Sequence, residues 1–271
     1  TNEMRIIGDL AGRESFFRGQ AIYAEHIHAD VADFVQPFGT YVPEAGDCVL
    51  FHYGISGGIG ERIRQWPHVT RALAYHNVTP ARYYQPHSLY VAGRLERARR
   101  ELREMRGCFD LAFADSQYNA GELRGVGYEN VHLLPVLFGL PDRGVAGSGE
   151  STGSQNSAEA GALPIRRGPR VLFVGRLAPN KGHADLLKTF YFLLRVYPEA
   201  RLIFAGSVAA HAESYRAELE RLRRYLGIAA DSVTFTGFLS DEALVREYER
   251  ADVFLCASHH EGFCVPLLEA M

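Results

Sequence analysis

Two glutamates close to the end of the sequence, Glu261 and Glu269, stand out by their type and spacing. Gly262 follows the first glutamate and lets a ligand come close to the backbone. If a helix begins near Phe263, its first N–H groups carry a partial positive charge that binds phosphate, and Glu269 lies one to two turns further on. The two carboxylates can then accept hydrogen bonds from a sugar and from a ribose diol. The pattern predicts a sugar-nucleotide site, with two unrelated surface glutamates as the alternative.

An earlier segment, residues 175–182, supplies positive charge. Gly175 ends an apolar run and is followed by Arg176, and Lys181 comes shortly before a helical pattern begins. A guanidinium and an ammonium group at that place suit a diphosphate. The segment is neither a Walker A loop nor a G-x-G-x-x-G loop. A surface turn with solvated cations is the alternative to a diphosphate site.

The histidines and cysteines do not predict a metal site. His259 and His260 adjoin Glu261, but neighbouring side chains usually point apart, and no further ligand spacing supports them. The four cysteines include no C-x-x-C pair. Because Cys48 and Cys256 lie in apolar runs, we expect them to be buried thiols in a reducing compartment. No metal and no separate cofactor are expected.

The elements that position these residues follow a regular order after residue 169. Four short apolar runs are expected to be strands, and each of the first three is followed by a glycine. Between the runs, apolar residues recur at the spacing of amphipathic helices, and Ser240 can cap the helix that reaches Arg250. Strands that are apolar throughout, alternating with helices, predict a parallel sheet covered on both faces. The expected strands are residues 171–174, 202–205, 233–236 and 253–256.

The first 141 residues repeat this order less regularly. The expected strands are residues 48–51, 72–75, 111–114 and 131–134. A helix from about Ser88 to Arg106 carries six arginines and three glutamates. A solvated face with pairs such as Glu96 and Arg100 is one interpretation of this helix, and contact with an anionic membrane is the other. Its expected apolar stripe is Leu89, Ala92, Leu95, Leu102 and Met105.

The segment between the two halves has a different composition. Residues 142–163 contain no aromatic side chain and are mostly glycine, alanine, serine and glutamate. Such a segment cannot bury enough surface to offset its ordering entropy, so we expect a flexible linker rather than a loop within one domain. The sequence therefore predicts an N-terminal domain over residues 1–141, a linker over residues 142–168 and a C-terminal domain over residues 169–271.

The overall composition limits the class of protein. The 271 residues carry a formal net charge of −3 and are 47% hydrophobic, which is ordinary for a globular protein and excludes nucleic-acid binding driven by overall basic charge. There is no run of 18 apolar residues and no signal-peptide core, so a cytoplasmic protein is expected. The last residues read as the opening of a helix with no strand after it. We therefore expect the C-terminal domain to be incomplete.

Taken together, the quoted residues resemble the donor half of retaining GT-B glycosyltransferases of family four, the glycosyl transferases group 1. The resemblance covers residues 169–271 and rests on the glycine-ended strands, on Lys181-Gly182 and on Glu261-Gly-Phe followed by Glu269. In the first half, residues 111–135 resemble the last strands of the acceptor domain, and residues 75–80 resemble the loop that supplies an active-site histidine. The resemblance implies two Rossmann-like, doubly wound parallel-sheet domains. The family's N-terminal glycine-rich loop is not visible.

The resemblance also implies roles for single residues. Arg176 and Lys181 would bind the donor diphosphate beside Gly175, and Glu261 would bind hydroxyls of the transferred sugar. Glu269 would hold the ribose diol. His76 would orient the sugar, and Leu239 would contact the base through its backbone. Backbone N–H groups contacting sugar and phosphate would come from Gly262, Phe263, Cys264 and Val265.

The implied activity is transfer of a hexose, such as mannose, from a UDP- or GDP-sugar to a glycan, a lipid-linked acceptor or a small molecule. The family's donor chemistry retains the anomeric configuration and needs no bound metal, and a role in polysaccharide biosynthesis is expected. The alternatives are a GT-B-like sugar-nucleotide epimerase and a non-catalytic nucleotide-sugar binding module. A peripheral contact with the inner face of the membrane is a further expectation, and no nucleic-acid partner is expected.

Overall fold

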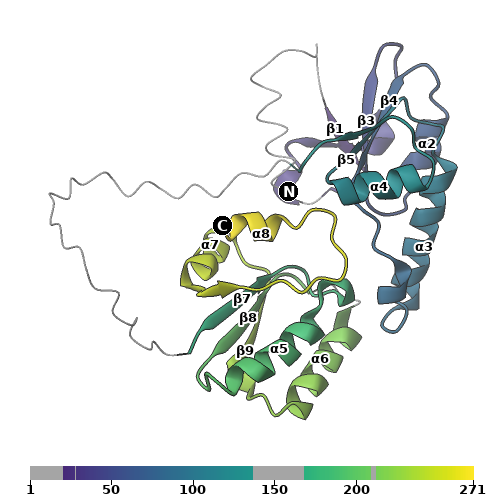
Figure 1. Ribbon diagram of the computed structural model, residues 1–271. Helices are drawn as coiled ribbons and strands as arrows, with labels where there is room; N and C mark the ends of the chain where they lie inside the picture. The colour runs from purple at the N-terminus through teal and green to yellow at the C-terminus, as the bar shows by residue number, and fades with distance from the viewer. Residues whose placement is uncertain (1–20, 28, 137–167, 209–211) are drawn as a thin grey trace, which may run out of the picture. The chain divides into compact units, whose positions relative to one another are not determined.

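A computed structural model of the protein describes residues 21–27, 29–136, 168–208 and 212–271. The chain forms two compact units (Figure 1). The first comprises Thr1–Gly139 with His260–Val265, and the second comprises Leu140–His259 with Pro266–Met271. The predicted linker lies almost entirely outside the described residues.

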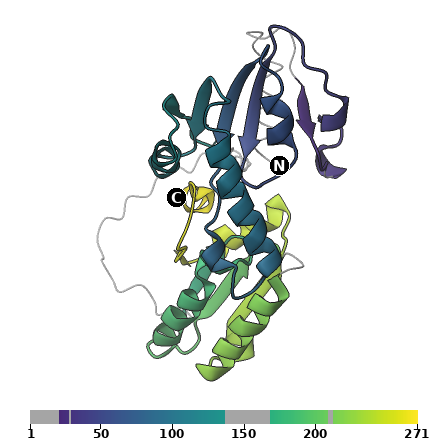
Figure 2. The same ribbon diagram turned by 90° about the vertical axis from the view of Figure 1, so that its right-hand side faces the viewer.

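The first unit is built on a four-stranded parallel sheet in the order β3-β4-β5-β6. Strands that follow one another in the chain pair side by side, and each of the three crossovers that parallel pairing requires contains a helix (Figure 2). A separate parallel pair, β1 (Ile22–Ala24) and β2 (Val35–Pro37), precedes the sheet. The strands of the sheet are β3 (Cys48–Tyr53), β4 (Thr70–Tyr75), β5 (Leu111–Ala114) and β6 (Val131–Leu133). The helices are α2 (Ile59–Arg64), α3 (Leu89–Glu104) and α4 (Gln117–Gly125), with short 3-10 helices η1 (Ala29–Val31), η2 (Phe38–Thr40) and η3 (Ala81–Tyr83).

Helix α3 packs on the sheet through the stripe that the sequence predicts, with one exception. Ala92, Leu95 and Leu102 are buried in the core of the first unit, but Leu89 is 79% exposed. Leu89 is the first residue of the helix, directly after Ser88, whose hydroxyl accepts a hydrogen bond from the backbone of Val91. At this end the helix extends beyond the buried stripe, so the prediction for Leu89 was wrong.

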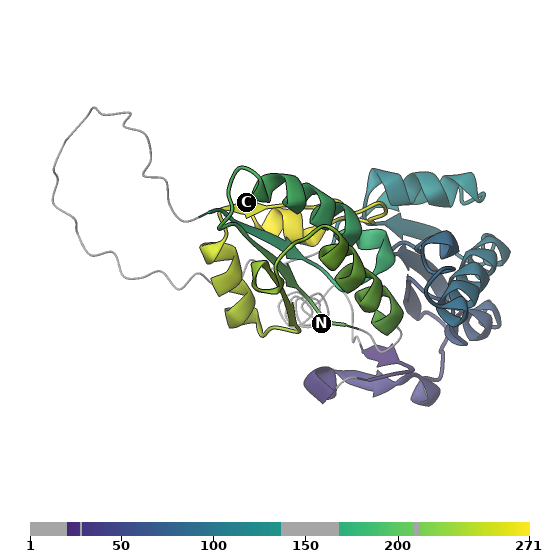
Figure 3. The ribbon, with the colours of Figure 1, turned by 90° about the horizontal axis from the view of Figure 1, so that it is seen from below.

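The second unit is a four-stranded parallel sheet in the order β10-β7-β8-β9. Helices α5 and α6 contribute to one apolar cluster and α7 contributes to another on the opposite face, so the sheet is covered on both sides (Figures 1 and 3). The strands are β7 (Arg170–Val174), β8 (Arg201–Ala205), β9 (Val233–Gly237) and β10 (Val253–Phe254). The helices are α5 (His183–Leu194), α6 (Glu213–Tyr225), α7 (Asp241–Arg250) and α8 (Val265–Glu269), with 3-10 helices η4 (Pro179–Lys181) and η6 (Ala230–Ser232).

The exposure of the cysteines differs from what their apolar runs predict. All four are free thiols. Cys48 is exposed, against the prediction of a buried thiol, and Cys256 is half-buried. Cys48 begins β3, an edge strand of its sheet whose side chains alternate between more and less exposed positions.

His183, at the start of α5, is a buried polar side chain in the apolar core of the second unit. It is 1% exposed, and its ring packs against Phe173 at 4.8 Å and Phe204 at 5.1 Å between ring centroids. Among the described residues, its Nδ1 has no hydrogen-bond partner. Burial, reinforced by the charge of Lys181 and opposed by a hydrogen bond to the backbone of Ala178, lowers the pKa of His183 to about 4.

This histidine should make the second unit sensitive to acid. In the unfolded chain the His183 pKa returns to about 6.5, so between pH 6.5 and pH 4 the unfolded state binds more protons and the free energy of unfolding falls as the pH is lowered. We expect His183 to account for a loss of about 3 kcal/mol over this range. Urea denaturation at pH 7 and pH 4.5 measures how much of the free energy of unfolding is lost on acidification. His183→Phe should lose much less stability on acidification than the wild type, whereas the exposed control His26→Phe should match the wild type; equal losses in all three proteins would contradict the assignment.

Candidate active site

The strand order of the second unit contains a topological switch point. From β7 the chain proceeds outward through β8 and β9, and it then returns to place β10 on the other side of β7. In open parallel sheets, ligands bind outside the carboxyl ends of the strands at such a point. In this sheet the switch point lies between the residues that follow β7 and those that follow β10.

The loop after β7 comes very close to neighbouring backbone. A side chain on Gly206, which follows β8 with φ +149°, would lie 2.1 Å from the carbonyl oxygen of Gly175. A side chain on Gly175 would meet the Phe173 ring at 3.0 Å, and the Cδ atom of Lys181 lies 4.0 Å from the same point. The two glycines thus let the strand ends approach each other. The aliphatic part of the Lys181 side chain lies over Gly175.

The same loop is fixed to the chain that follows β10. Gly182 has φ +71°, and a Cβ atom there would lie 2.0 Å from the carbonyl oxygen of Ala257. The backbone N–H of His259 donates to the carbonyl of Asn180 at 2.9 Å. The His259 ring also pairs with Asp185 of α5 at 2.8 Å. These contacts bring the loop of residues 175–182 and the segment after β10 together across the switch point.

Among the predicted cations, Arg176 is exposed and Lys181 is half-buried. Both belong to the second unit, as do Leu239 and Glu269. The side chain of Leu239 packs against the smaller apolar cluster of the sheet, which leaves its backbone as the part able to contact a ligand. The sequence therefore placed Gly175, Arg176 and Lys181 correctly in one loop at the carboxyl edge of the sheet.

Glu269 is the last residue of α8, a helix that begins at Val265 rather than near Phe263. Its Oε2 atom accepts a hydrogen bond from the Tyr248 hydroxyl at 2.8 Å. The same hydroxyl is 3.3 Å from the carbonyl oxygen of Pro266. Tyr248 of α7 therefore orients this carboxylate, and its second oxygen can accept further hydrogen bonds.

The segment His260–Val265 packs with the first unit. A side chain on Gly262 would meet the Asn119 amide at 3.1 Å and the Cβ atom of Asn77 at 3.2 Å, so this position is closely packed. Cys264 has φ +66°, a left-handed conformation that is uncommon outside glycine and is often retained at functional sites. Glu261 is half-buried within this segment.

His260 in this segment has different surroundings from its neighbour His259. It is 6% exposed and lies between two aromatic rings, at 6.2 Å from Tyr83 and 5.7 Å from Tyr118. Burial lowers the pKa of His260. The nearby carboxylate of Glu122 opposes this shift, and the guanidinium groups of Arg99 and Arg82 add to it. At neutral pH His260 therefore packs as an uncharged ring.

His76 directly follows β4 and has two side-chain partners from the neighbouring strands. Its Nδ1 atom is 3.1 Å from the carboxylate of Asp115, which follows β5 and is 7% exposed. Its Nε2 atom is 2.7 Å from Nδ1 of His52 in β3, and the two rings are stacked at 4.9 Å. Desolvation of the His52 ring, together with His76, lowers the pKa of His52. Neutral His52 can then donate its Nδ1–H to His76 while His76 donates its own to Asp115.

The predicted site did not include His52 and Asp115, the two partners of His76. The usable signal is topological, since residues at the carboxyl ends of three adjacent parallel strands meet at one edge of the sheet. Asn77, the next residue, has φ +75° and donates to the side chain of Asn119 at 2.7 Å. The strained backbone of Asn77 and the two side-chain partners fix the orientation of the His76 ring.

The predicted site residues thus fall into two groups. The first unit contains His76 and the segment from Glu261 to Val265, and the second contains Gly175, Arg176, Lys181, Leu239 and Glu269. Gly175, Arg176, Lys181 and Leu239 follow strands of the second sheet, as the sequence predicts. The segment from Glu261 to Val265 was expected in the C-terminal domain, and it groups instead with the first unit. Within the described parts of the chain, no helix is both long and apolar enough to cross a bilayer.

A family of known proteins matches the C-terminal part of the chain. Residues 159–271 match the family described as "Glycosyl transferases group 1". Mannosylfructose-phosphate synthase of Agrobacterium fabrum is 31% identical over 65% of this chain, which corresponds to 38% of that protein. The serotype-specific mannosyltransferase WbdA of Escherichia coli is 32% identical over 44% of this chain and 14% of that protein. The chain therefore spans well under half the length of these relatives.

Solved structures confirm the predicted α/β fold with parallel sheets, the fold of GT-B glycosyltransferases. Sucrose-phosphate synthase from Thermosynechococcus elongatus matches with a TM-score of 0.58 and 22% identity, covering 82% of this chain and 53% of that one. Anabaena HepE, solved in complex with UDP and glucose, matches with a TM-score of 0.50 and 14% identity, covering 83% of this chain and 78% of that one. At these identities the likeness shows the fold alone.

Proposed function

We propose, from the match of residues 159–271 to the glycosyl transferases group 1, that this protein transfers a hexose from a nucleotide-diphosphate sugar to an acceptor. The observation that carries the proposal is the cationic loop at the switch point of the matched sheet. Arg176 and Lys181 lie in a loop that the contacts of Gly175, Gly182 and Gly206 fix in place. A pre-positioned pair of cations is what a departing nucleotide diphosphate requires, because negative charge develops on the leaving phosphate.

The proposal also assigns roles to the other residues that the sequence predicts for the site. Glu261 binds hydroxyl groups of the transferred sugar, and backbone N–H groups of the segment after it bind the sugar and phosphate. Glu269, oriented by Tyr248, accepts hydrogen bonds from the ribose diol. The relatives named for mannosyl transfer favour mannose as the sugar. The acceptor is a glycan, a lipid-linked sugar or a small molecule.

We further propose that the anomeric configuration is retained. Retaining glycosidases use a carboxylate nucleophile on the reacting face, and no predicted residue has that role. A same-face reaction is consistent with this set of residues: the bond from the sugar to the diphosphate breaks, the acceptor oxygen adds to the same face, and the leaving phosphate takes the acceptor proton. The cations beside the phosphate stabilise the charge that develops on it.

His76 is proposed to orient the transferred sugar, with Asp115 as a positioning residue that acts through the imidazole ring. Asp115→Asn keeps the shape of the side chain but removes the charge that fixes the ring at 3.1 Å. We expect kcat to fall about a hundredfold, the effect of a small misplacement of a reacting group, with little change in the KM for the donor. Steady-state kinetics checks this split. Asp33→Asn, at an exposed position of the same unit, should leave both constants unchanged; a change in KM alone would contradict the positioning role.

The function is tested by incubating the protein with UDP- and GDP-hexoses and analysing the products. Release of a nucleoside diphosphate together with a glycosylated acceptor supports transfer. Interconversion of donors in the absence of any acceptor would instead identify a sugar-nucleotide epimerase. Donor binding by calorimetry without turnover on any acceptor would identify a binding module. Either of the last two results would overturn the proposed transferase.

A further inference from the structure

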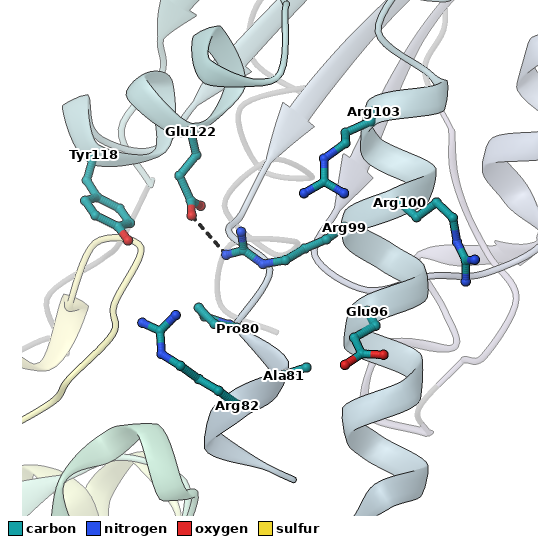
Figure 4. A pocket seen from close by; sticks show the side chains of 9 residues that line it. All are labelled: Pro80, Ala81, Arg82, Glu96, Arg99, Arg100, Arg103, Tyr118 and Glu122. Carbon is teal, nitrogen blue, oxygen red and sulfur yellow. Dashed lines mark hydrogen bonds and ion pairs between the residues drawn. The ribbon is translucent and has the colours of Figure 1, made fainter.

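The first unit contains a cationic hollow that the proposed donor site does not use. It encloses about 590 Å³ between η3, the second half of α3 and α4, and four arginines and two glutamates line it. In Figure 4 the guanidinium groups of Arg82, Arg99 and Arg103 turn toward a common space, whereas Arg100 points away from it along α3. We call this the arginine hollow, and its volume is in the range of ordinary small-molecule sites.

One of these arginines is held rigidly in place. Nη2 of Arg99 donates to the carbonyl oxygen of Val78 at 2.6 Å and to Glu122 at 2.9 Å. Glu122 in turn accepts hydrogen bonds from the Tyr75 hydroxyl at 2.9 Å and from the Asn77 amide at 3.3 Å. A carboxylate shared among these donors cannot also neutralise the other arginines. Arg99 therefore forms a fixed wall of the hollow, with its position set by the β4 end of the sheet.

The guanidinium groups of Arg82 and Arg103 face the hollow and do not pair with the glutamates that line it. Within the described residues, neither Arg82 nor Arg103 forms an ion pair, and the expected pair between Glu96 and Arg100 is not formed. Glu96 accepts instead from Gln85 at 3.3 Å. Arg82 stacks over the Tyr83 ring at 4.9 Å. Cations gathered in this way repel one another, and an anion placed between them removes that repulsion.

The arrangement suits a phosphate ester in particular. Guanidinium groups bind phosphate through paired N–H donors in a planar fork, and three of them can serve the oxygens of one phosphate group. Tyr118, in the first turn of α4, is 54% exposed and borders the hollow with its ring and hydroxyl (Figure 4). It offers an apolar surface and a hydrogen-bonding group to the organic part of the ligand.

We propose that the arginine hollow binds a phosphate ester and that, resting on the proposed transfer reaction, this is a phosphate group of the acceptor. The ligand is a soluble sugar phosphate or the phosphate of a lipid-linked acceptor. Arg99 supplies the fixed contact, and Arg82 and Arg103 close on the phosphate from the 3-10 helix and from α3.

Binding is measured by calorimetry with the full chain and no donor, using mannose 6-phosphate, free mannose and vesicles of phosphatidylglycerol or phosphatidylcholine. We expect a dissociation constant on the order of 1 mM or below for a phosphate-bearing probe. Arg103→Gln and Arg82→Gln should each weaken it about tenfold. Arg97→Gln removes the same charge from an exposed position of α3 outside the hollow and should leave it unchanged. Binding of the sugar phosphate identifies a soluble ligand, and binding of anionic vesicles alone identifies a lipid headgroup.

The proposal is overturned if no phosphate-bearing probe binds, if free mannose binds as well as its phosphate, or if Arg97→Gln weakens binding as much as Arg103→Gln does. The last result would mean a diffuse attraction to a basic helix. This binding experiment contains no nucleotide sugar, so its result does not depend on whether the protein turns over a donor. The proposed phosphate site and the proposed transfer reaction can therefore fail separately.

Discussion

Replacing Arg176 and Lys181 together by glutamine is expected to lower kcat/KM for the nucleotide-sugar donor by about a thousandfold. Loss of a single preorganised donor to developing charge commonly costs about a hundredfold or more, and here both cations of the loop are removed. Arg176 is exposed, and Lys181 lies in a loop whose shape depends on glycines, so the fold should survive. Steady-state kinetics with varied donor checks the loss, and circular dichroism checks the fold.

The matched control for this double variant is Arg221→Gln, which removes a guanidinium from an exposed position of α6 in the same unit. It should keep the wild-type kcat/KM. Nucleoside diphosphate affinity should fall with the double variant and not with the control. An unchanged affinity for UDP and GDP in the double variant would show that the loop after β7 does not bind the diphosphate.

The second large effect is expected at Glu261. Glu261→Gln retains the size of the side chain but removes the negative charge that accepts strong hydrogen bonds from sugar hydroxyls, and we expect kcat/KM to fall by about three orders of magnitude. Affinity for the free nucleoside diphosphate should change little, since that part of the donor does not reach this carboxylate in the proposal. Comparing donor turnover with nucleotide binding in the same variant separates the two contributions.

Glu249→Gln serves as the control, because it removes a carboxylate from an exposed position near the end of α7. Full activity is expected from it. If Glu261→Gln turns over donor at the wild-type rate while folded, the assigned role of Glu261 is wrong. If it loses nucleotide binding as well, Glu261 supports the fold of the segment rather than contacting the sugar.

Most of the secondary structure could be predicted because short apolar runs and turn residues are local signals. The strand Leu111–Ala114 was predicted with its observed bounds, and Ser240 caps α7 by accepting a hydrogen bond from the backbone of Ala243. Errors occurred where position within the sheet decides burial. Cys48 looked buried in an apolar run, but it begins an edge strand whose residues alternate.

Contacts between distant segments could not be read from the sequence in the same way. His52 lies within a strand and Asp115 follows another, and only the pairing of β3, β4 and β5 brings both to His76. The packing of Gly262 against Asn77 and Asn119 joins residues more than 140 positions apart in the chain. The arginines of α3 were recognised as a charged face, but the hollow needs η3 and α4 to form its other sides.

A proton NMR time course of the protein with GDP-mannose or a UDP-hexose and a sugar acceptor tests the central claim most directly. Methyl mannoside and mannose 6-phosphate serve as acceptors, and the anomeric signals of donor and product are followed together. The account predicts loss of the donor signal, release of the nucleoside diphosphate and a new glycosidic signal with the anomeric configuration of the donor. A product of inverted configuration, or an altered donor with no nucleotide released, would contradict it.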